Sequence, residues 1–214
     1  MAADAVRGHG LEALGRGSRL AAIARSKPDN AHRPVAGPDR AVYLRQLEVG
    51  DAQTLLDVLL RDRAFLDRWE PVRKDTFFTL ETQQRGLAKL REAEDFVDFG
   101  IFLEDGDELV GRLQLSGISP SPFENAYLGY FVSEQHNGRG YATEAVRQGV
   151  DVAFGELDLH RVQAAVIPRN VASVRVLEKA GFRHEGLALR YLQIAGVWED
   201  HLLYAVTAEE WPSA

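Results

Sequence analysis

Two glycines between a strand pattern and a long helical pattern constrain this 214-residue chain more than any other feature. Ala126–Val132 reads as an apolar strand, Gly138 and Gly140 follow it, and Gly138–Glu156 carries apolar residues at helical spacing. A turn without Cβ atoms lets backbone N–H groups point at one spot, and the helix N-terminus adds partial positive charge. The segment predicts a phosphate or pyrophosphate site, although ordinary turn glycines would give the same pattern.

This turn differs from the two best-known nucleotide loops. The Gly-Lys-Ser/Thr of a Walker loop is absent, and the third position of G-x-G-x-x-G is Thr143. A conventional nucleotide-binding loop is therefore not predicted.

The patterns on both sides of the turn predict one α/β domain with a sheet that is antiparallel at its start. Strands are expected at 41–47, 96–103, 109–116, 126–132, 161–167, 183–189 and 197–204. Helices are expected at 51–62, 80–93, 138–156 and 170–180. Asp105-Gly106 predicts a hairpin turn with positive φ, and Gly181 suits a left-handed residue at a helix end.

Residues 1–38 differ from the rest of the chain. They are rich in Ala, Gly and Arg, and they end in a loop-like run from Ser26 to Pro38. A signal peptide would need an apolar segment after its basic start, and none is present. We expect a disordered N-terminal extension, or an over-long start, followed by a domain over 39–214; a short helix over Gly10–Arg25 is the alternative.

Composition excludes several classes of function. The chain has no cysteine, so a disulfide framework and a thiol nucleophile are excluded, and a cytoplasmic location is expected. The net charge of −7 argues against nucleic-acid binding and suits a cationic substrate, although mild acidity also serves solubility. No apolar run approaches the roughly 20 residues that span a bilayer, so no membrane association is expected.

Several separate segments match one family in the same order. Q-x-x-G-x-G at 135–140, followed by Y-A-T-E-A-V, resembles the acetyl-CoA loop of GNAT acetyltransferases. His160-Arg161, N-V-A-S at 170–173, L-E-K-A-G-F at 177–182 and E-G at 185–186 leading to Asp200 resemble the second half of that fold. F-L-D-R-W-E-P at 65–71 is similar to a segment of the RimJ/RimL-like ribosomal-protein N-terminal acetyltransferases. The resemblance covers about residues 40–207.

The resemblance implies the α/β (α+β) GNAT fold: a single domain, about four helices, and a mixed sheet of about seven strands splayed between the fourth and fifth. It implies acetyl-CoA as acetyl donor and no metal. Pantetheine would pair with the strand backbone, and pyrophosphate would rest on the amides of the glycine turn. The implied cofactor-binding residues are Phe131, Val132, Ser133, Gly138, Arg139, Gly140, Tyr141, Ala142, Thr143, Asn170 and Ser173. Arg139 is equally consistent with a solvated loop residue.

Acetyl transfer to an amine needs a neutral amine, an approach of about 3–3.5 Å and a proton for the leaving thiolate. The resemblance implies a backbone N–H near Val132 as oxyanion donor and Ser173 as general acid. Asn170 is a favoured helix N-cap, so capping is an equally good reading of the N-x-x-S pattern.

The general base is missing from its expected places. Where relatives carry carboxylates, this chain has Tyr127, Gln163 and Leu192. The remaining candidates are Glu70, Glu124 and Glu185, or a water held by the backbone. A protein amino terminus titrates near pH 8 and lysine near 10.4, so an enzyme acting on a terminus needs only modest help.

The acceptor is the least constrained part of the prediction. Trp69 and Tyr191 are candidates for an acceptor groove, with packing against the core as the alternative for each. We expect acetylation of a protein N-terminal α-amino group, such as that of a ribosomal protein, by a monomer or homodimer. An acetyltransferase for a small amine (aminoglycoside or polyamine) and a non-catalytic acetyl-CoA sensor are the alternatives.

Overall fold

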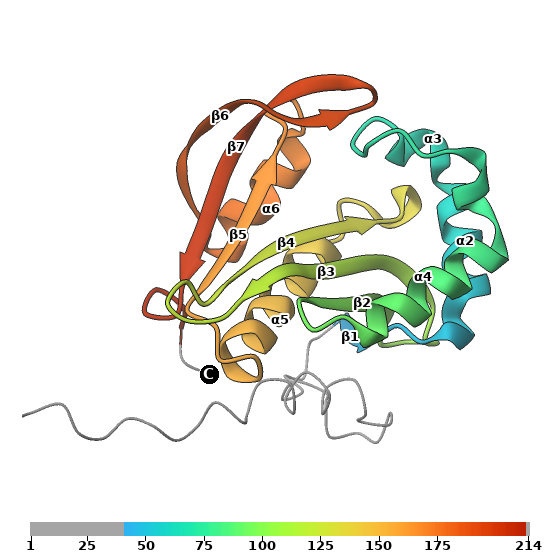
Figure 1. The fold of residues 1–214 in the computed structure, drawn as a ribbon, viewed down its shortest axis with the longest axis horizontal. Helices are drawn as coiled ribbons and strands as arrows, with labels where there is room; N and C mark the ends of the chain where they lie inside the picture. Colours follow the sequence, from blue (N-terminus) through green and yellow to red (C-terminus); the bar gives the residue numbers. More distant parts are fainter. Residues whose placement is uncertain (1–40, 213–214) are drawn as a thin grey trace, which may run out of the picture.

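A seven-stranded mixed sheet organises residues 41–212, the part of the chain that our computed structural model describes (Figure 1). The strand order is β1-β2-β3-β4-β5-β7-β6. The strands are β1 (Val42–Gln46), β2 (Phe96–Leu103), β3 (Leu109–Ser119), β4 (Asn125–Val132), β5 (Arg161–Val166), β6 (Arg183–Ile194) and β7 (Val197–Thr207). The predicted N-terminal extension, residues 1–38, lies outside the described residues, and so does the alternative prediction of a short helix over 10–25.

Helices cover both faces of the sheet. The α-helices are α2 (Ala52–Arg61), α3 (Arg63–Leu66), α4 (Leu80–Glu92), α5 (Tyr141–Gly155) and α6 (Val171–Ala180), and the 3-10 helices are η2 (Val49–Asp51), η3 (Asp75–Phe78) and η4 (Glu134–His136). Figure 1 shows α5 and α6 together behind the sheet, and α2 and α4 beside β2 and β3. None of the helices in residues 41–212 is long and apolar enough to cross a membrane.

Two hydrophobic cores follow from the alternation of side chains along the strands. Ile101 packs in the core that α5 and α6 cover, and its neighbour Phe102 packs in the core beneath α2 and α4. Successive residues of a strand point to opposite faces, so the nearly continuous apolar run of β2 supplies both cores.

One pair of neighbouring strands opens the sheet. β4 and β5 are parallel and pair only at Asn125–Tyr127 with Arg161–Gln163. Beyond these residues the strands diverge, and every other neighbouring pair in the sheet is antiparallel. The predicted splay between the fourth and fifth strands is confirmed (Figure 1).

A buried side chain of α5 protects the edge strand β1. Gln148 is buried, its Oε1 accepts from the Leu44 N–H (3.1 Å) and its Nε2 donates to the Val42 carbonyl (2.8 Å). The amide satisfies the backbone groups that an edge strand would otherwise expose for pairing with another chain.

Most predicted elements lie within a few residues of their observed bounds, and the differences have local causes. The helix predicted from Gly138 begins at Tyr141, because Gly138 (φ 78°) and Gly140 (φ 87°) are left-handed. β6 extends beyond its predicted end to Ile194, since an irregularity with Arg190 at φ 50° interrupts the pattern without ending the pairing with β7. α3 was too short to predict.

Candidate active site

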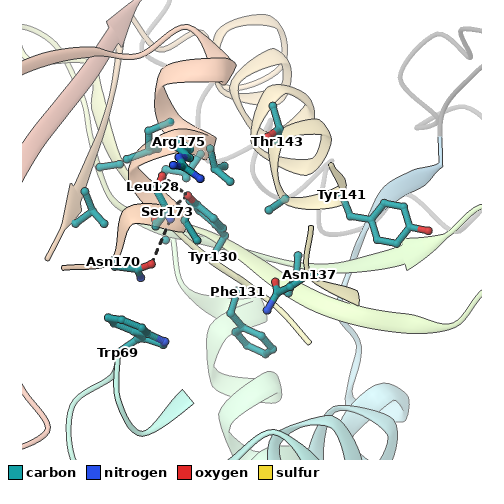
Figure 2. A pocket seen from close by; sticks show the side chains of 18 of the residues that line it. Trp69, Leu128, Tyr130, Phe131, Asn137, Tyr141, Thr143, Asn170, Ser173 and Arg175 are labelled. Atoms are coloured by element: carbon teal, nitrogen blue, oxygen red, sulfur yellow. Dashed lines mark hydrogen bonds between the residues drawn. The ribbon is translucent and has the colours of Figure 1, made fainter. Parts of the chain in front are cut away.

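A cavity of about 550 Å³ fills the gap between the splayed strands. Its walls come from β4, β5, the glycine turn before α5, and α6, and its mouth is formed by α3 and the residues that follow it (Figure 2). A cavity of this size suits a cofactor-sized ligand. Among residues 41–212 no cluster of three or more His, Asp or Glu side chains could hold a metal ion.

One edge of β4 has backbone groups directed into this gap. The Ser133 N–H donates to the Val110 carbonyl (2.7 Å), and Val132 pairs with Gly111 in the antiparallel ladder to β3. Backbone groups alternate between the two edges of a strand, so the N–H and C=O groups of Tyr130 and Val132 face β5 across the opening. This edge can pair with an extended ligand that carries amide groups.

Ser133, a predicted contact to pantetheine, has no free backbone group. Its N–H is bonded to Val110, its carbonyl accepts from the His136 N–H (2.9 Å), and its Oγ accepts from Arg61 (3.0 Å). Ser133 also lies outside the cavity lining, whereas Phe131 and Val132 belong to it. The backbone groups of β4 that are free to bind a ligand are therefore those of Tyr130 and Val132, and Ser133 offers none.

The glycine turn ends with free helix amides. Gly140 is the N-cap of α5, and the first helical bond runs from the Glu144 N–H to the Gly140 carbonyl (3.1 Å). The amides of Tyr141, Ala142 and Thr143 precede that bond, so no intrahelical partner is available to them. A Cβ at Gly138 or Gly140 would meet no atom within 4 Å, so these glycines serve backbone conformation and open space rather than packing.

Two cations on α6 line the same region. Arg175 and Lys179 lie one helical turn apart in the cavity wall, and an i,i+4 pair of cations was the sequence signal that could have found them. The predicted Arg139 instead donates to the Gln135 carbonyl (3.5 Å) and lies outside the lining. The cations that line the cavity beside the turn therefore come from α6.

Ser173 bonds Asn170 through its N–H and Tyr130 through both its hydroxyl and its carbonyl, which accepts from the Tyr130 hydroxyl (3.3 Å) (Figure 2). Its N–H donates to Oδ1 of the N-cap residue Asn170 (3.2 Å), while its Oγ lies 2.8 Å from the hydroxyl oxygen of Tyr130 on β4. Burial raises the pKa of Tyr130 to about 12, so its hydroxyl stays protonated in the physiological range. Capping is performed by the side chain of Asn170, which leaves the Ser173 hydroxyl available for chemistry. Tyr130 itself was not predicted.

Of the three predicted carboxylates, only Glu70 lines the cavity. Burial raises the pKa of Glu70, against the opposing effect of Arg73 and Arg112. Glu185 lies outside the lining, and the hydrogen bond from Arg161 lowers its pKa. Glu124 lies in the turn before β4, also away from the cavity. The structure thus brings Glu70 to the site and leaves the other two candidates elsewhere.

The two predicted aromatic residues have different positions. Trp69 lines the cavity, and the Arg169 guanidinium lies 5.0 Å from its ring centre. Tyr191 lies outside the lining, with its ring 5.5 Å from that of His201. His201, which does line the cavity from β7, was not predicted, because nothing in its sequence neighbourhood suggested chemistry.

Comparison with known proteins identifies the family. A family model described as an acetyltransferase (GNAT) domain matches residues 41–183. This chain is a GNAT acetyltransferase. The predicted family and its seven-stranded fold with four longer helices are therefore confirmed.

Individual relatives of this GNAT acetyltransferase agree with that assignment. The probable N-acetyltransferase YjcK of Bacillus subtilis is 42% identical, over 78% of this chain and 94% of the relative. The ribosomal protein uS5-alanine N-acetyltransferase of Escherichia coli is 33% identical, over 81% and 90% of the two chains. The structure of Mycobacterium smegmatis RimJ in complex with CoA-disulfide matches with a TM-score of 0.77 and 35% identity, over 81% and 85%.

The GNAT protein is therefore an acetyl-CoA-dependent N-acetyltransferase of the RimJ/RimL-like type. A spermidine N-acetyltransferase of Vibrio cholerae matches with a TM-score of 0.69 but only 22% identity, so that likeness extends to the fold alone.

Proposed function

We propose that this enzyme transfers the acetyl group of acetyl-CoA to the N-terminal α-amino group of a protein, such as a ribosomal protein. The observation that carries the proposal is the likeness to the E. coli uS5-alanine acetyltransferase and to M. smegmatis RimJ, each above 30% identical over about four-fifths of the chain. The name of YjcK specifies no acceptor, and the fold alone does not choose one.

The cavity fits the donor. Free amides at the start of α5 and the cations Arg175 and Lys179 can hold the phosphates of acetyl-CoA. The unpaired edge of β4 at Tyr130 and Val132 can pair with the amides of the pantetheine arm. Acetyl-CoA supplies the activated acetyl group, and these residues bind and orient it between the splayed strands.

Three groups are placed to assist the transfer. The Val132 N–H faces the opening and can donate to the carbonyl oxygen as negative charge develops on it. The Ser173 hydroxyl can give a proton to the leaving sulfur. Tyr130, hydrogen bonded to Ser173, holds that hydroxyl in position on the side of α6.

The mouth of the cavity suits a cationic chain end. Trp69 forms one wall and Glu70 supplies a carboxylate, which attracts the ammonium form of an incoming terminus. The tip of the β6–β7 hairpin lies against this wall, since the Ala195 N–H donates to the Glu70 carbonyl (3.0 Å). Leu189 and Leu192 are exposed on β6, before this tip, and can contact the residues after the acetylated one.

A thiol-release assay tests this proposal. Acetyl-CoA is offered with peptides bearing free Ala or Ser termini, the same peptides with blocked termini and one internal lysine, an aminoglycoside and spermidine. We expect turnover with the free termini and none with the blocked peptides. Preferred turnover of spermidine or an aminoglycoside would overturn the acceptor class while leaving the acetyltransferase intact.

A further inference from the structure

Amine acetylation requires an acceptor for the amine proton, and the cavity offers few. Among the described residues that line it, the carboxylate and imidazole side chains are those of Glu70, His136 and His201. The three positions where relatives carry carboxylates hold Tyr127, Gln163 and Leu192, and none of these lines the cavity. The base must therefore be sought among those three lining residues or in water.

Two of them are poorly placed for this role. His136 lies on η4 beside the glycine turn, 6.2 Å from the Tyr141 ring, at the proposed phosphate end of the cavity. The Glu70 side chain is 30% exposed at the mouth and has Arg73 at 3.8 Å, so it lies where an incoming cation first arrives. His136 is buried like His201, but it lies at the proposed phosphate end of the cavity, and Glu70 is partly exposed.

The ring of His201 is enclosed by the protein and borders the cavity. The residue is 2% exposed and belongs to the cavity lining. Its Nδ1 lies 3.0 Å from the Glu199 carbonyl oxygen. A carbonyl can only accept, so Nδ1 carries the hydrogen and Nε2 of the neutral ring keeps its lone pair. Nε2 has no hydrogen bond to any described residue.

Further contacts surround this part of β7. Arg169 donates to the Glu199 carboxylate (2.8 Å) and also stacks on Trp69, which ties β7 to the cavity mouth. The centre of the Tyr191 ring lies 5.5 Å from that of the imidazole. An imidazole in the cavity lining that is anchored to the backbone through one nitrogen, with no hydrogen-bond partner among the described residues for the other, is an arrangement that a general base can use.

We propose that His201 is the general base of this acetyltransferase. The amine nitrogen forms a bond to the acetyl carbon, its proton passes to Nε2 of His201, the carbon–sulfur bond breaks, and the sulfur takes a proton from Ser173. Solvent then removes the proton from His201 and restores that of Ser173. This inference rests on acetyl transfer to an amine and on the proposed orientation of the donor, not on the identity of the acceptor.

Two substitutions of His201 test the proposal. His201→Asn keeps an N–H that can bond the Glu199 carbonyl but removes the basic nitrogen, and His201→Ala leaves room for added imidazole. We expect kcat/KM to fall about 100-fold in both variants, within the usual range for general base catalysis. CoA affinity should stay near the wild-type value in both variants, which should remain folded at the assay temperature, and imidazole should raise the rate of His201→Ala.

The matched control is His184→Asn, a histidine on β6 outside the cavity lining, which should keep wild-type kinetics. Assays use whichever amine the acceptor screen turns over fastest, so failure with peptide termini would leave this test intact. Activity of His201→Asn within threefold of wild type would overturn the proposal. A loss of rate in His201→Ala that added imidazole does not relieve would also overturn it. The same holds if Glu70→Gln lowers kcat more than the His201 substitutions do.

Discussion

The hydroxyl oxygen of Tyr130 lies 2.8 Å from Oγ of Ser173, and this contact joins one splayed strand to the first turn of α6. Because Asn170 performs the capping of that turn, the Ser173 hydroxyl is held by Tyr130 and not by the helix end. The pair therefore belongs to the cavity wall, where a proton donor to sulfur is needed.

Loss of either hydroxyl of this pair should slow acetyl transfer. We expect Ser173→Ala to lower kcat by about 10–100-fold, somewhat below the general-catalysis range since water can partly substitute. Tyr130→Phe should have a smaller effect, and the double variant should be no slower than Ser173→Ala, because both changes remove one coupled unit. CoA affinity, measured by calorimetry, should barely change. Fully additive losses would show that the residues act independently.

The glycine turn predicts a specific loss of donor affinity. Gly140→Val should raise the Kd of acetyl-CoA at least tenfold, roughly 1.4 kcal/mol, because a side chain would enter the space beside the free amides and strain a left-handed residue. Gly106→Val is the control: it has a similar φ (85° against 87°) and equally open surroundings in the β2–β3 turn. Calorimetry should show unchanged affinity for that control; unchanged affinity for Gly140→Val would remove the phosphate assignment.

The order of elements and the glycine turn could be predicted because they depend on local patterns. The apolar periodicity of α5 and the positive φ of Gly106 and Gly181 follow from spacing and backbone sterics. The splay between β4 and β5 could not be derived from such patterns, and it was expected only through the family resemblance.

The parts of the site that escaped prediction are contacts between distant segments. Tyr130 and Ser173 are 43 positions apart, and their meeting depends on how α6 packs behind the open sheet. His201 reaches the cavity only because β7 inserts between β5 and β6. Conversely, the sequence suggested Glu185 as a possible base, but in the structure Arg161 on β5 donates a hydrogen bond to its carboxylate.

Removal of residues 1–38 should leave the domain intact. We propose a domain boundary near residue 39, because β1 begins at Val42 and the Ala41 N–H contacts Glu144 on α5 (3.3 Å). The truncated protein should keep its melting temperature within a few degrees and its acetyl-CoA affinity. A truncation through Gln46 is the contrast, since it removes β1 and should unfold the domain. If calorimetry shows a large fall in melting temperature after removal of residues 1–38, the domain boundary lies before residue 39.

The buried side-chain amide of Gln148 should contribute more to the free energy of unfolding than that of an exposed glutamine. Gln148→Met keeps the length of the side chain but leaves the Leu44 N–H and the Val42 carbonyl without their partners. Each unsatisfied buried group costs about 1–3 kcal/mol, so we expect a loss of about 2–4 kcal/mol in the free energy of unfolding. Gln53→Met, on the exposed face of α2, should change it by less than about 0.5 kcal/mol. Urea titrations of both variants decide this.

The carboxylate of Glu70 should destabilise the fold at neutral pH. Burial raises its pKa in the folded protein, so between the ordinary glutamate value and the raised value the folded state binds more protons than the unfolded state. Stability is then lost as pH rises through that window, and the full penalty applies above the folded pKa. Glu70→Gln removes the ionisation, so its melting temperature should exceed that of wild type at pH 7 and approach it near pH 4.

Glu70→Gln should also weaken acceptor binding, because the carboxylate that lowers stability is the one that attracts the cationic acceptor. We expect Glu70→Gln to raise KM for a cationic acceptor while kcat stays closer to wild type, since the proposed base is His201. Glu81→Gln, an exposed change on α4, should alter neither the melting temperature nor KM. Steady-state kinetics with a free peptide terminus separate the two parameters. A fall in kcat with KM unchanged would instead make Glu70 the group that takes the proton.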